Sequence, residues 1–290
     1  MIRTRLTAFA FAALAAGPAL AQAQPADKIV VPFGETAMVA DPCPPQPAVP
    51  ILKPAEPGKP AVYAAPEVLA AWQRYGAWRA ANDWPDFCHY QAENRALMAA
   101  KGPRPRVVFM GDSITELWRL YDPGFFTNGV VDRGISGQTT PQMVTRFYPD
   151  VVALRPRIVH IMAGTNDIAG NTGVNSEAEF KANIAAMVDL ARANGIRVVL
   201  ASIPPTKTFS WRKELKPAAE VRALNAWLKA YAASHGAVYA DYYTGLTDAE
   251  GGMKAAYSLD GVHPVSAGYA VMKAEALKAL ERADARKGGR

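Results

Sequence analysis

Hydrophobic residues along the chain fall into two patterns that alternate. Short runs of consecutive apolar residues are typical of strands that are covered on both faces of a sheet. Stretches in which apolar residues recur every three or four positions predict amphipathic helices. The predicted strands are 106–113, 129–132, 158–163, 197–203 and 237–243, and the main predicted helices among them are 176–195, 218–236 and 266–285.

The order of these elements predicts the fold class. Strands that alternate with helices indicate right-handed crossovers and a parallel, doubly wound sheet, so we expect an α/β protein. The helix at 176–195 begins with a capping box, in which Ser176 is followed three residues later by Glu179. Ser266 is the expected cap of the last helix. In such sheets ligands bind beyond the carboxyl ends of the strands.

The N-terminal part of the chain consists of three segments that differ from this pattern. Residues 1–23 combine a basic start, an apolar run and small residues, which predicts a cleaved secretory signal peptide; an uncleaved anchor is the alternative. Residues 24–65 form a proline-rich arm, in which regular helix is excluded. Residues 66–103 form a helical extension, with helices from Pro66 and over roughly 90–100. We therefore expect an exported protein, periplasmic or extracellular.

The composition narrows the function classes. Half of the 290 residues are hydrophobic and a fifth are charged, which excludes a wholly disordered chain. The net charge is +6, but the chain has no block of five or more like charges, so nucleic acid is not an expected partner. Once the signal is removed, we expect no integral membrane segment, because a spanning helix needs about 20 apolar residues.

The expected export makes a disulfide between the two cysteines possible. In an oxidising compartment Cys43 and Cys88 are candidates for a disulfide that pins the proline-rich arm, and two free thiols are the alternative. The chain has no CxxC pair and only 4 histidines, so no metal site is predicted.

Two segments near the start of the predicted sheet carry candidate chemistry. Ser113 follows the first strand, in Gly-Asp-Ser, at the expected start of a helix. Backbone N–H groups at such a position favour developing negative charge, and the alternative is that Ser113 is the cap of that helix. Gly134 and Gly137 follow the strand 129–132, where glycine permits close approach of the backbone to a ligand or simply a tight turn.

Two further segments lie at later strand ends or loops. Asn166 follows the strand 158–163 and can donate its side-chain N–H into a cleft, although asparagine in a loop is also ordinary turn chemistry. Asp260 and His263 lie three residues apart just before the last helix. A carboxylate beside an imidazole fixes its tautomer and supports proton transfer. The alternative is a turn that carries a surface histidine.

Together these segments resemble a known family. GDSIT at 111–115, DRGISG at 132–137, GTND at 164–167 and DGVHP at 260–264 are similar, in order and spacing, to the four blocks of the SGNH (GDSL-type) esterase superfamily. The likeness is to secreted bacterial members similar to platelet-activating-factor acetylhydrolase-like proteins and carbohydrate acetylesterases. It implies a flavodoxin-like three-layer α/β/α sandwich with a parallel central sheet over residues 104–286.

The resemblance also implies the roles of individual residues. Ser113 matches the nucleophile, His263 the general base and Asp260 the carboxylate that orients it. The oxyanion hole is implied to consist of the Ser113 N–H, the Gly134 N–H and the side-chain amide of Asn166. No metal or organic cofactor is required. The family commonly has Asn where this chain has Asp132.

The expected reaction is hydrolysis of a small-molecule or glycan ester, and we favour acetyl groups on carbohydrates. Trp118, close after the nucleophile block, and Trp211, in the inserted loop 206–217, are candidate substrate contacts. Lysophospholipase, thioesterase or general arylesterase activity is the alternative within the family. The alternatives outside the family are a non-catalytic glycan-binding module and a flavodoxin-like cofactor binder.

Overall fold

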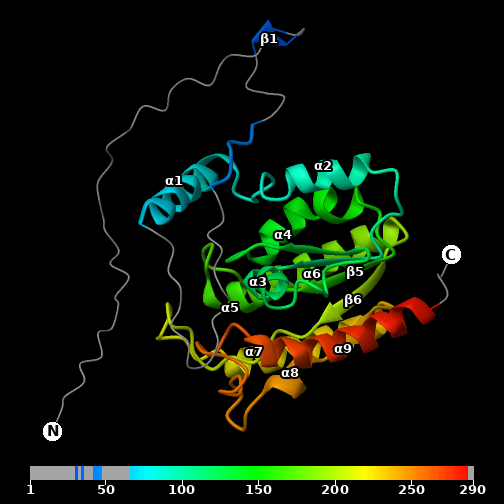
Figure 1. Ribbon diagram of the computed structural model, residues 1–290. Helices are drawn as coiled ribbons and strands as arrows, with labels where there is room; N and C mark the ends of the chain where they lie inside the picture. The colour runs from blue at the N-terminus through cyan, green and yellow to red at the C-terminus, as the bar shows by residue number, and fades with distance from the viewer. Residues whose placement is uncertain (1–29, 32–33, 36–41, 48–65, 287–290) are drawn as a thin grey trace. The chain divides into compact units, whose positions relative to one another are not determined.

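The computed structural model describes residues 30–31, 34–35, 42–47 and 66–286 (Figure 1). The predicted signal peptide and most of the proline-rich arm lie outside the described residues. The described residues divide into two units between Pro44 and Pro45. In the first unit β1 (Val30–Val31) pairs antiparallel with β2 (Gly34–Glu35).

The second unit is built on a five-stranded sheet in the order β4-β3-β5-β6-β7. Every neighbouring pair in it is parallel, so the predicted α/β class is confirmed. This order reverses direction between β3 and β5, which is the switch point where ligands bind in doubly wound sheets. The strands are β3 (Val107–Gly111), β4 (Val130–Gly134), β5 (Ile158–Met162), β6 (Arg197–Ala201) and β7 (Val238–Ala240).

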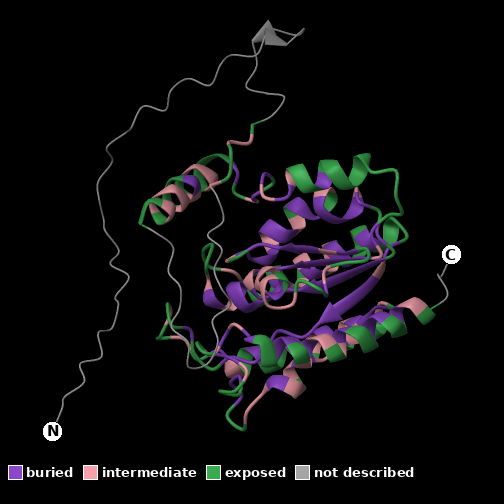
Figure 2. Ribbon diagram, viewed as in Figure 1, coloured by how far each residue is buried: buried purple, intermediate pink, exposed green. Residues whose placement is uncertain are grey.

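The helices lie in layers on the two sides of this sheet. Side chains alternate along each strand, so Val108 and Met110 face one core cluster while Val107 and Phe109 face the other. The first cluster is completed by α4, α6 and α7, and the second by α3, α8 and α9. Figure 2 shows the strands buried and the outer faces of the helices exposed. The bounds are α3 (Ser113–Tyr121), α4 (Thr140–Phe147), α6 (Glu177–Ala193), α7 (Ala218–Ser234), α8 (Tyr242–Leu246) and α9 (Ser266–Ala285).

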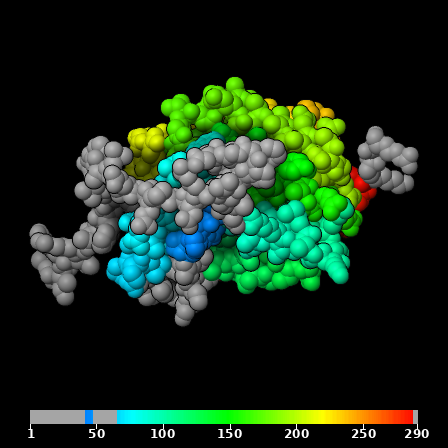
Figure 3. All heavy atoms as spheres, turned by 90° about the horizontal axis from the view of Figure 1, so that it is seen from above, coloured from blue at the N-terminus to red at the C-terminus, as the bar shows by residue number. Residues whose placement is uncertain are grey.

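Three further helical segments complete the unit. The π-helical turn η1 (Tyr148–Val152) continues α4, and the short helix α5 (Thr165–Ala169) follows β5. The extension contains α1 (Pro66–Asn82) and α2 (Gln91–Ala99), as the sequence predicted. Both are seen at the surface of the face drawn in Figure 3.

Helix ends show where the sequence prediction succeeded and where it failed. The capping box of α6 is confirmed, since Ser176 Oγ accepts the Glu179 N–H and Glu179 accepts the Ser176 N–H. Ser266 is not the cap of α9, because Val265 occupies that place and Ser266 is already helical. The Val265 N–H donates to Tyr257 O at 2.8 Å, which holds Val265 extended.

The predicted strand 237–243 is too long at its end. It stops at Ala240 because Asp241 caps a new helix, α8, by accepting the Thr244 N–H at 3.1 Å. The apolar residue that follows, Tyr242, is buried from this helix and not from the strand. A run of apolar residues therefore signalled burial correctly but not the type of element.

Trp118 belongs to the core, so the prediction that it contacts substrate is wrong. The side chain is fully buried, and Phe125 and Tyr269 stack on it with ring centroids 5.0 and 5.5 Å away. The cause is helical periodicity: Trp118 lies four residues after Ile114 and therefore on the same sheet-facing side of α3.

Replacing Trp118 by alanine tests this placement. We expect the free energy of unfolding to fall by about 3–5 kcal/mol, because the substitution leaves a large cavity in the core. Urea denaturation of the purified variant measures it. The control is Tyr148→Ala, a substitution at a side chain that is 62% exposed, where a change within about 0.5 kcal/mol is expected. Equal unfolding midpoints for the two variants would contradict a core position for Trp118.

Candidate active site

Ser113 is the first residue of α3 and lies directly beyond the carboxyl end of β3. The N-cap is Asp112, whose side chain accepts the Ile114 N–H at 2.9 Å. The alternative interpretation of Ser113 as the helix cap is therefore excluded. Since the first N–H groups of a helix have no partner within it, the Ser113 N–H is not used by α3.

A continuous chain of hydrogen bonds joins Ser113 to residues 150 positions away. Ser113 Oγ lies 2.9 Å from His263 Nε2, and His263 Nδ1 lies 2.7 Å from Asp260 Oδ2. Because the Nδ1–H donates to the carboxylate, Nε2 is the acceptor that faces the hydroxyl. The structure thus brings together the three residues that the sequence singled out.

Asp260 is held by more than the imidazole. Its Oδ1 accepts the N–H groups of Val262 and His263 at 2.9 and 2.8 Å and the Ser258 hydroxyl at 3.0 Å. The carboxylate therefore organises the whole loop before α9 and fixes the position of the histidine. An isolated turn with a surface histidine does not describe this segment.

The charges of this group reinforce one another. Burial works to raise the pKa of Asp260, but the hydrogen bonds and charge of His263 outweigh it and hold that pKa well below its ordinary value. Burial works to lower the pKa of His263, whereas the Asp260 carboxylate raises it, and the balance is upward. Burial raises the pKa of Asp112, beside the serine, to about 6.

Gly134 does not serve as the sequence predicted. Its N–H donates to Asp132 Oδ1 at 2.7 Å, so it is not available to a ligand. A Cβ atom at this position would lie 2.2 Å from Glu116 N and 2.7 Å from Asp112 O. Glycine is needed here because the end of β4 packs against the first turn of α3. This corrects the assignment of Gly134 to the oxyanion hole.

Gly137, which the resemblance did not include in the oxyanion hole, differs from Gly134 in its surroundings. It has a φ of +80°, which favours glycine, and a Cβ there would meet no atom within 4 Å. Its N–H finds no acceptor among the described residues, whereas the neighbouring Gln138 N–H donates to Ile135 O. The signal was present in the sequence as the second glycine of DRGISG, but spacing alone did not distinguish the two.

Asn166 is fixed in orientation by its neighbours. Its Nδ2 donates to Gln138 O at 3.0 Å and, over a longer 3.3 Å, to Asp112 Oδ2, while its Oδ1 accepts from Asn171 at 2.6 Å. The amide therefore lies between the end of β3 and the loop after β4. The adjacent Asp167 braces α4 by accepting the Thr140 N–H and hydroxyl.

A fully buried arginine ties these loops together. Arg146 donates to Gly111 O at 3.0 Å, to Gln138 Oε1 at 2.5 Å and to Asp150 Oδ2 at 2.8 Å. Gly111 O also accepts the Ile135 N–H at 3.1 Å. The residue before Asp112-Ser113 and the loop after β4 are thus fastened to the same side chain.

Trp211 lies beside the histidine. Its ring centroid is 6.5 Å from that of His263, and 41% of the residue is exposed. Its Nε1 donates to Asn171 Oδ1 at 3.0 Å, and Asn171 in turn donates to Asn166. A partly exposed indole beside His263 offers apolar surface to a ligand bound there.

Other features expected from the sequence concern the rest of the chain. Cys43 and Cys88 are both disulfide-bonded. Within residues 42–47 and 66–286, no group of three or more His, Cys, Asp or Glu side chains is arranged to hold a metal ion. None of the described helices is both long and apolar enough to cross a membrane.

Known proteins are similar to this chain over different lengths. The sequence profile of the GDSL-like lipase/acylhydrolase family matches residues 109–271. Esterase TesA of Pseudomonas aeruginosa is 31% identical over 153 residues, 51% of this chain and 67% of that protein. The lipoprotein YqeF of Bacillus subtilis is 35% identical over 80 residues, which span 26% of this chain and only 32% of that protein. The structure of a GDSL-like lipase from Bacteroides thetaiotaomicron has 42% identity and a TM-score of 0.66, covering 69% of this chain and 100% of that one.

The titration of His263 tests the electrostatics of the site. By NMR we expect its imidazole pKa to lie above the ordinary value of about 6.5, because Asp260 stabilises the charged form. In Asp260→Asn this stabilisation is lost and burial remains, so the pKa of His263 should fall. The other three histidines serve as internal controls in the same spectra. An unchanged His263 titration in that variant would contradict the coupling.

Proposed function

The chain belongs to the GDSL-like lipase/acylhydrolase family, which places it among the carboxylic ester hydrolases, and we propose that Ser113 is its catalytic nucleophile. The observation that carries this proposal is the hydrogen-bond chain from Ser113 Oγ through His263 to Asp260, at 2.9 and 2.7 Å. This is the arrangement that a general base and its orienting carboxylate need to activate a hydroxyl.

The reaction follows from this arrangement. His263 Nε2 takes the hydroxyl proton while Ser113 Oγ bonds to the ester carbonyl carbon, giving a tetrahedral oxyanion. The intermediate collapses when the carbon–oxygen bond to the alcohol breaks, and the alcohol leaves with the proton held by His263. Water, deprotonated by the same nitrogen, then attacks the acyl carbon. The bond from that carbon to Ser113 Oγ breaks as Oγ takes the proton back from His263, and the acid is released. Asp260 holds the imidazole in the required tautomer and stabilises its charged form.

Three N–H groups are proposed to hold the oxyanion: those of Ser113, Gly137 and the Asn166 side chain. The N–H groups of Ser113 and Gly137 have no acceptor among the described residues. One N–H of the Asn166 side chain makes only a long 3.3 Å contact with Asp112. An oxyanion at hydrogen-bond distance would replace that long contact with a shorter one. Removal of one such donor typically lowers turnover by about 10²–10³-fold.

The proposed substrate is a short acyl ester, acetyl in the first place, on a carbohydrate. Trp211 supports this because its half-exposed ring lies beside His263 and is held in place by Asn171. We further propose export to the periplasm or the extracellular space. The support is the signal-like sequence of residues 1–23 together with two disulfide-bonded cysteines, which are typical of oxidising compartments.

Hydrolysis of p-nitrophenyl acetate, butyrate, octanoate and palmitate tests the reaction and the acyl group together. We expect activity on the two shorter esters and a loss of at least about 10³-fold in Ser113→Ala. The Ser113→Ala protein should keep its circular dichroism spectrum, which shows that the fold is intact. Retained turnover in Ser113→Ala would refute the nucleophile, and a maximum at octanoate or beyond would move the substrate to lipids or thioesters. A folded wild-type protein without any activity would favour a glycan-binding module.

Trp211→Ala tests the carbohydrate. We expect KM for an acetylated oligosaccharide to rise about tenfold, because the stacking surface is lost, while KM for p-nitrophenyl acetate changes little. Tyr148→Ala, at another exposed aromatic residue, is the matched control and should leave both values unchanged. An equal rise of KM for both substrates would argue against a sugar-stacking role.

A further inference from the structure

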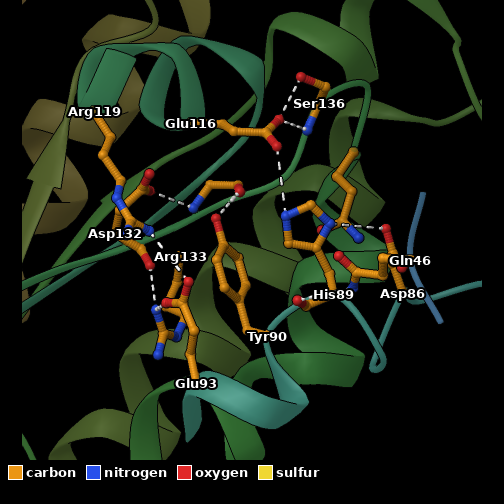
Figure 4. A network of polar contacts seen from close by, with 12 residues as sticks. Gln46, Asp86, His89, Tyr90, Glu93, Glu116, Arg119, Asp132, Arg133 and Ser136 are labelled. Atoms are coloured by element: carbon orange, nitrogen blue, oxygen red, sulfur yellow. Dashed lines mark hydrogen bonds and ion pairs between the residues drawn. The ribbon is translucent and has the colours of Figure 1, made fainter. Parts of the chain in front are cut away.

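A segment that precedes the matched family region packs against the site. Residues 83–94, here called the docking segment, connect α1 to α2 and continue into that helix, whereas the family match begins at residue 109. They contact residues 134–138, here called the β4 loop, which contain Gly137. Figure 4 shows this contact from close by.

The first contact is made by Tyr90. Its hydroxyl donates to Gly134 O at 2.5 Å, and the residue is only 4% exposed. The Arg133 guanidinium lies 4.4 Å from the centre of its ring. Burial raises the pKa of this hydroxyl well above its ordinary value, so it stays protonated and remains a donor. Tyr90 thus fastens the first residue of the β4 loop to the docking segment.

The second contact runs through Glu116. Its Oε2 accepts both the N–H and the hydroxyl of Ser136, at 2.7 and 2.5 Å, and its Oε1 lies 3.4 Å from His89 Nε2. His89 Nδ1 lies 3.5 Å from Asp86, which in turn pairs with Arg79 at 2.7 Å. The residue directly before Gly137 is therefore held by a carboxylate that the docking segment faces with His89.

The third contact lies on the other side of Gly137. The Gln138 side chain donates to Pro85 O at 2.8 Å and accepts from Arg146 at 2.5 Å. The docking segment is itself anchored by Asn94, which bonds both Arg133 and Asp150 in the interior. Residues 134, 136 and 138 are thus all restrained, whereas a Cβ atom at Gly137 would meet no atom within 4 Å.

We propose that the docking segment positions the Gly137 N–H for the oxyanion, and that Tyr90 and His89 are positioning residues of the reaction. The inference rests on the proposed function of Ser113. Glycine is the most flexible residue, and no side chain of Gly137 can fix its own peptide. The direction of the Gly137 N–H is therefore set by the neighbouring residues. A group misplaced by about 1 Å can lower the rate on the order of 10²-fold.

Tyr90→Phe is the sharpest test, because it removes one hydroxyl and keeps the buried ring. We expect kcat for p-nitrophenyl acetate to fall about tenfold with KM within a factor of two, since an oxyanion donor acts mainly in the transition state. The inhibition constant of a trifluoromethyl ketone, whose serine adduct carries the oxyanion, should rise by a similar factor. Tyr239→Phe in β7 is the matched control: it removes a hydroxyl that donates to Asn225 O of α7 at 3.4 Å, and its kinetics should not change.

A graded pair at residue 116 gives an independent measurement. Glu116→Gln keeps one oxygen that can accept the Ser136 N–H, so its kcat should lie between those of the wild type and Glu116→Ala. His89→Phe should lower kcat in the same way as Glu116→Ala, but by a smaller factor. The same split, a lower kcat with an unchanged KM, is expected for each variant.

The outcomes separate this inference from the proposed function. An inactive Ser113→Ala combined with wild-type kcat in Tyr90→Phe and Glu116→Ala would overturn the inference and leave the nucleophile in place. An active Ser113→Ala would overturn both. If kcat falls only in proportion to a lowered melting temperature, or KM rises equally, the docking segment is merely structural and the inference is wrong.

Discussion

The site depends on one carbonyl group, that of Gly111 at the end of β3. It accepts the Ile135 N–H at 3.1 Å and a guanidinium N–H of the buried Arg146 at 3.0 Å. The bond from Ile135 holds the loop after β4 against β3, the strand that precedes Ser113. Arg146 also donates to the Gln138 side chain, so Gln138 is held to the same place. Because a buried charge is retained only where its hydrogen bonds are satisfied, Arg146 allows these groups little freedom. Ser113 and the groups proposed to hold the oxyanion thus share one support.

Some residues that contact the site lie before the region that matches the family. The profile begins at residue 109, inside β3, yet the β4 loop is braced by Tyr90 and by the backbone of Pro85. The extension is therefore more than a covering of the domain, since its contacts converge on the loop that carries Gly137. Helix α2 contributes through Asn94, which places a neutral amide between the buried charges of Arg133 and Asp150.

Much of this architecture could be predicted from the sequence, because buried strands and amphipathic helices leave periodic traces. The residues of the hydrogen-bonded chain were also predicted, through motifs whose order matches a family. What failed depends on three-dimensional contacts. Gly134 and Gly137 are equivalent in sequence, and only the Asp132 carboxylate and the first turn of α3 assign the former to packing. Trp118 follows Ser113 closely, but the helix turns it into the core. The bracing by Tyr90 joins residues 44 positions apart and leaves no local signal.

Covalent labelling shows directly whether Ser113 is the nucleophile. The full-length protein is treated with a fluorophosphonate, and the adduct is located by peptide mapping and mass spectrometry. We expect a single adduct on Ser113, formed in step with loss of hydrolysis and much more slowly in His263→Ala, where the hydroxyl is no longer activated. An adduct on another residue, or full inhibition with Ser113 unmodified, would contradict that expectation.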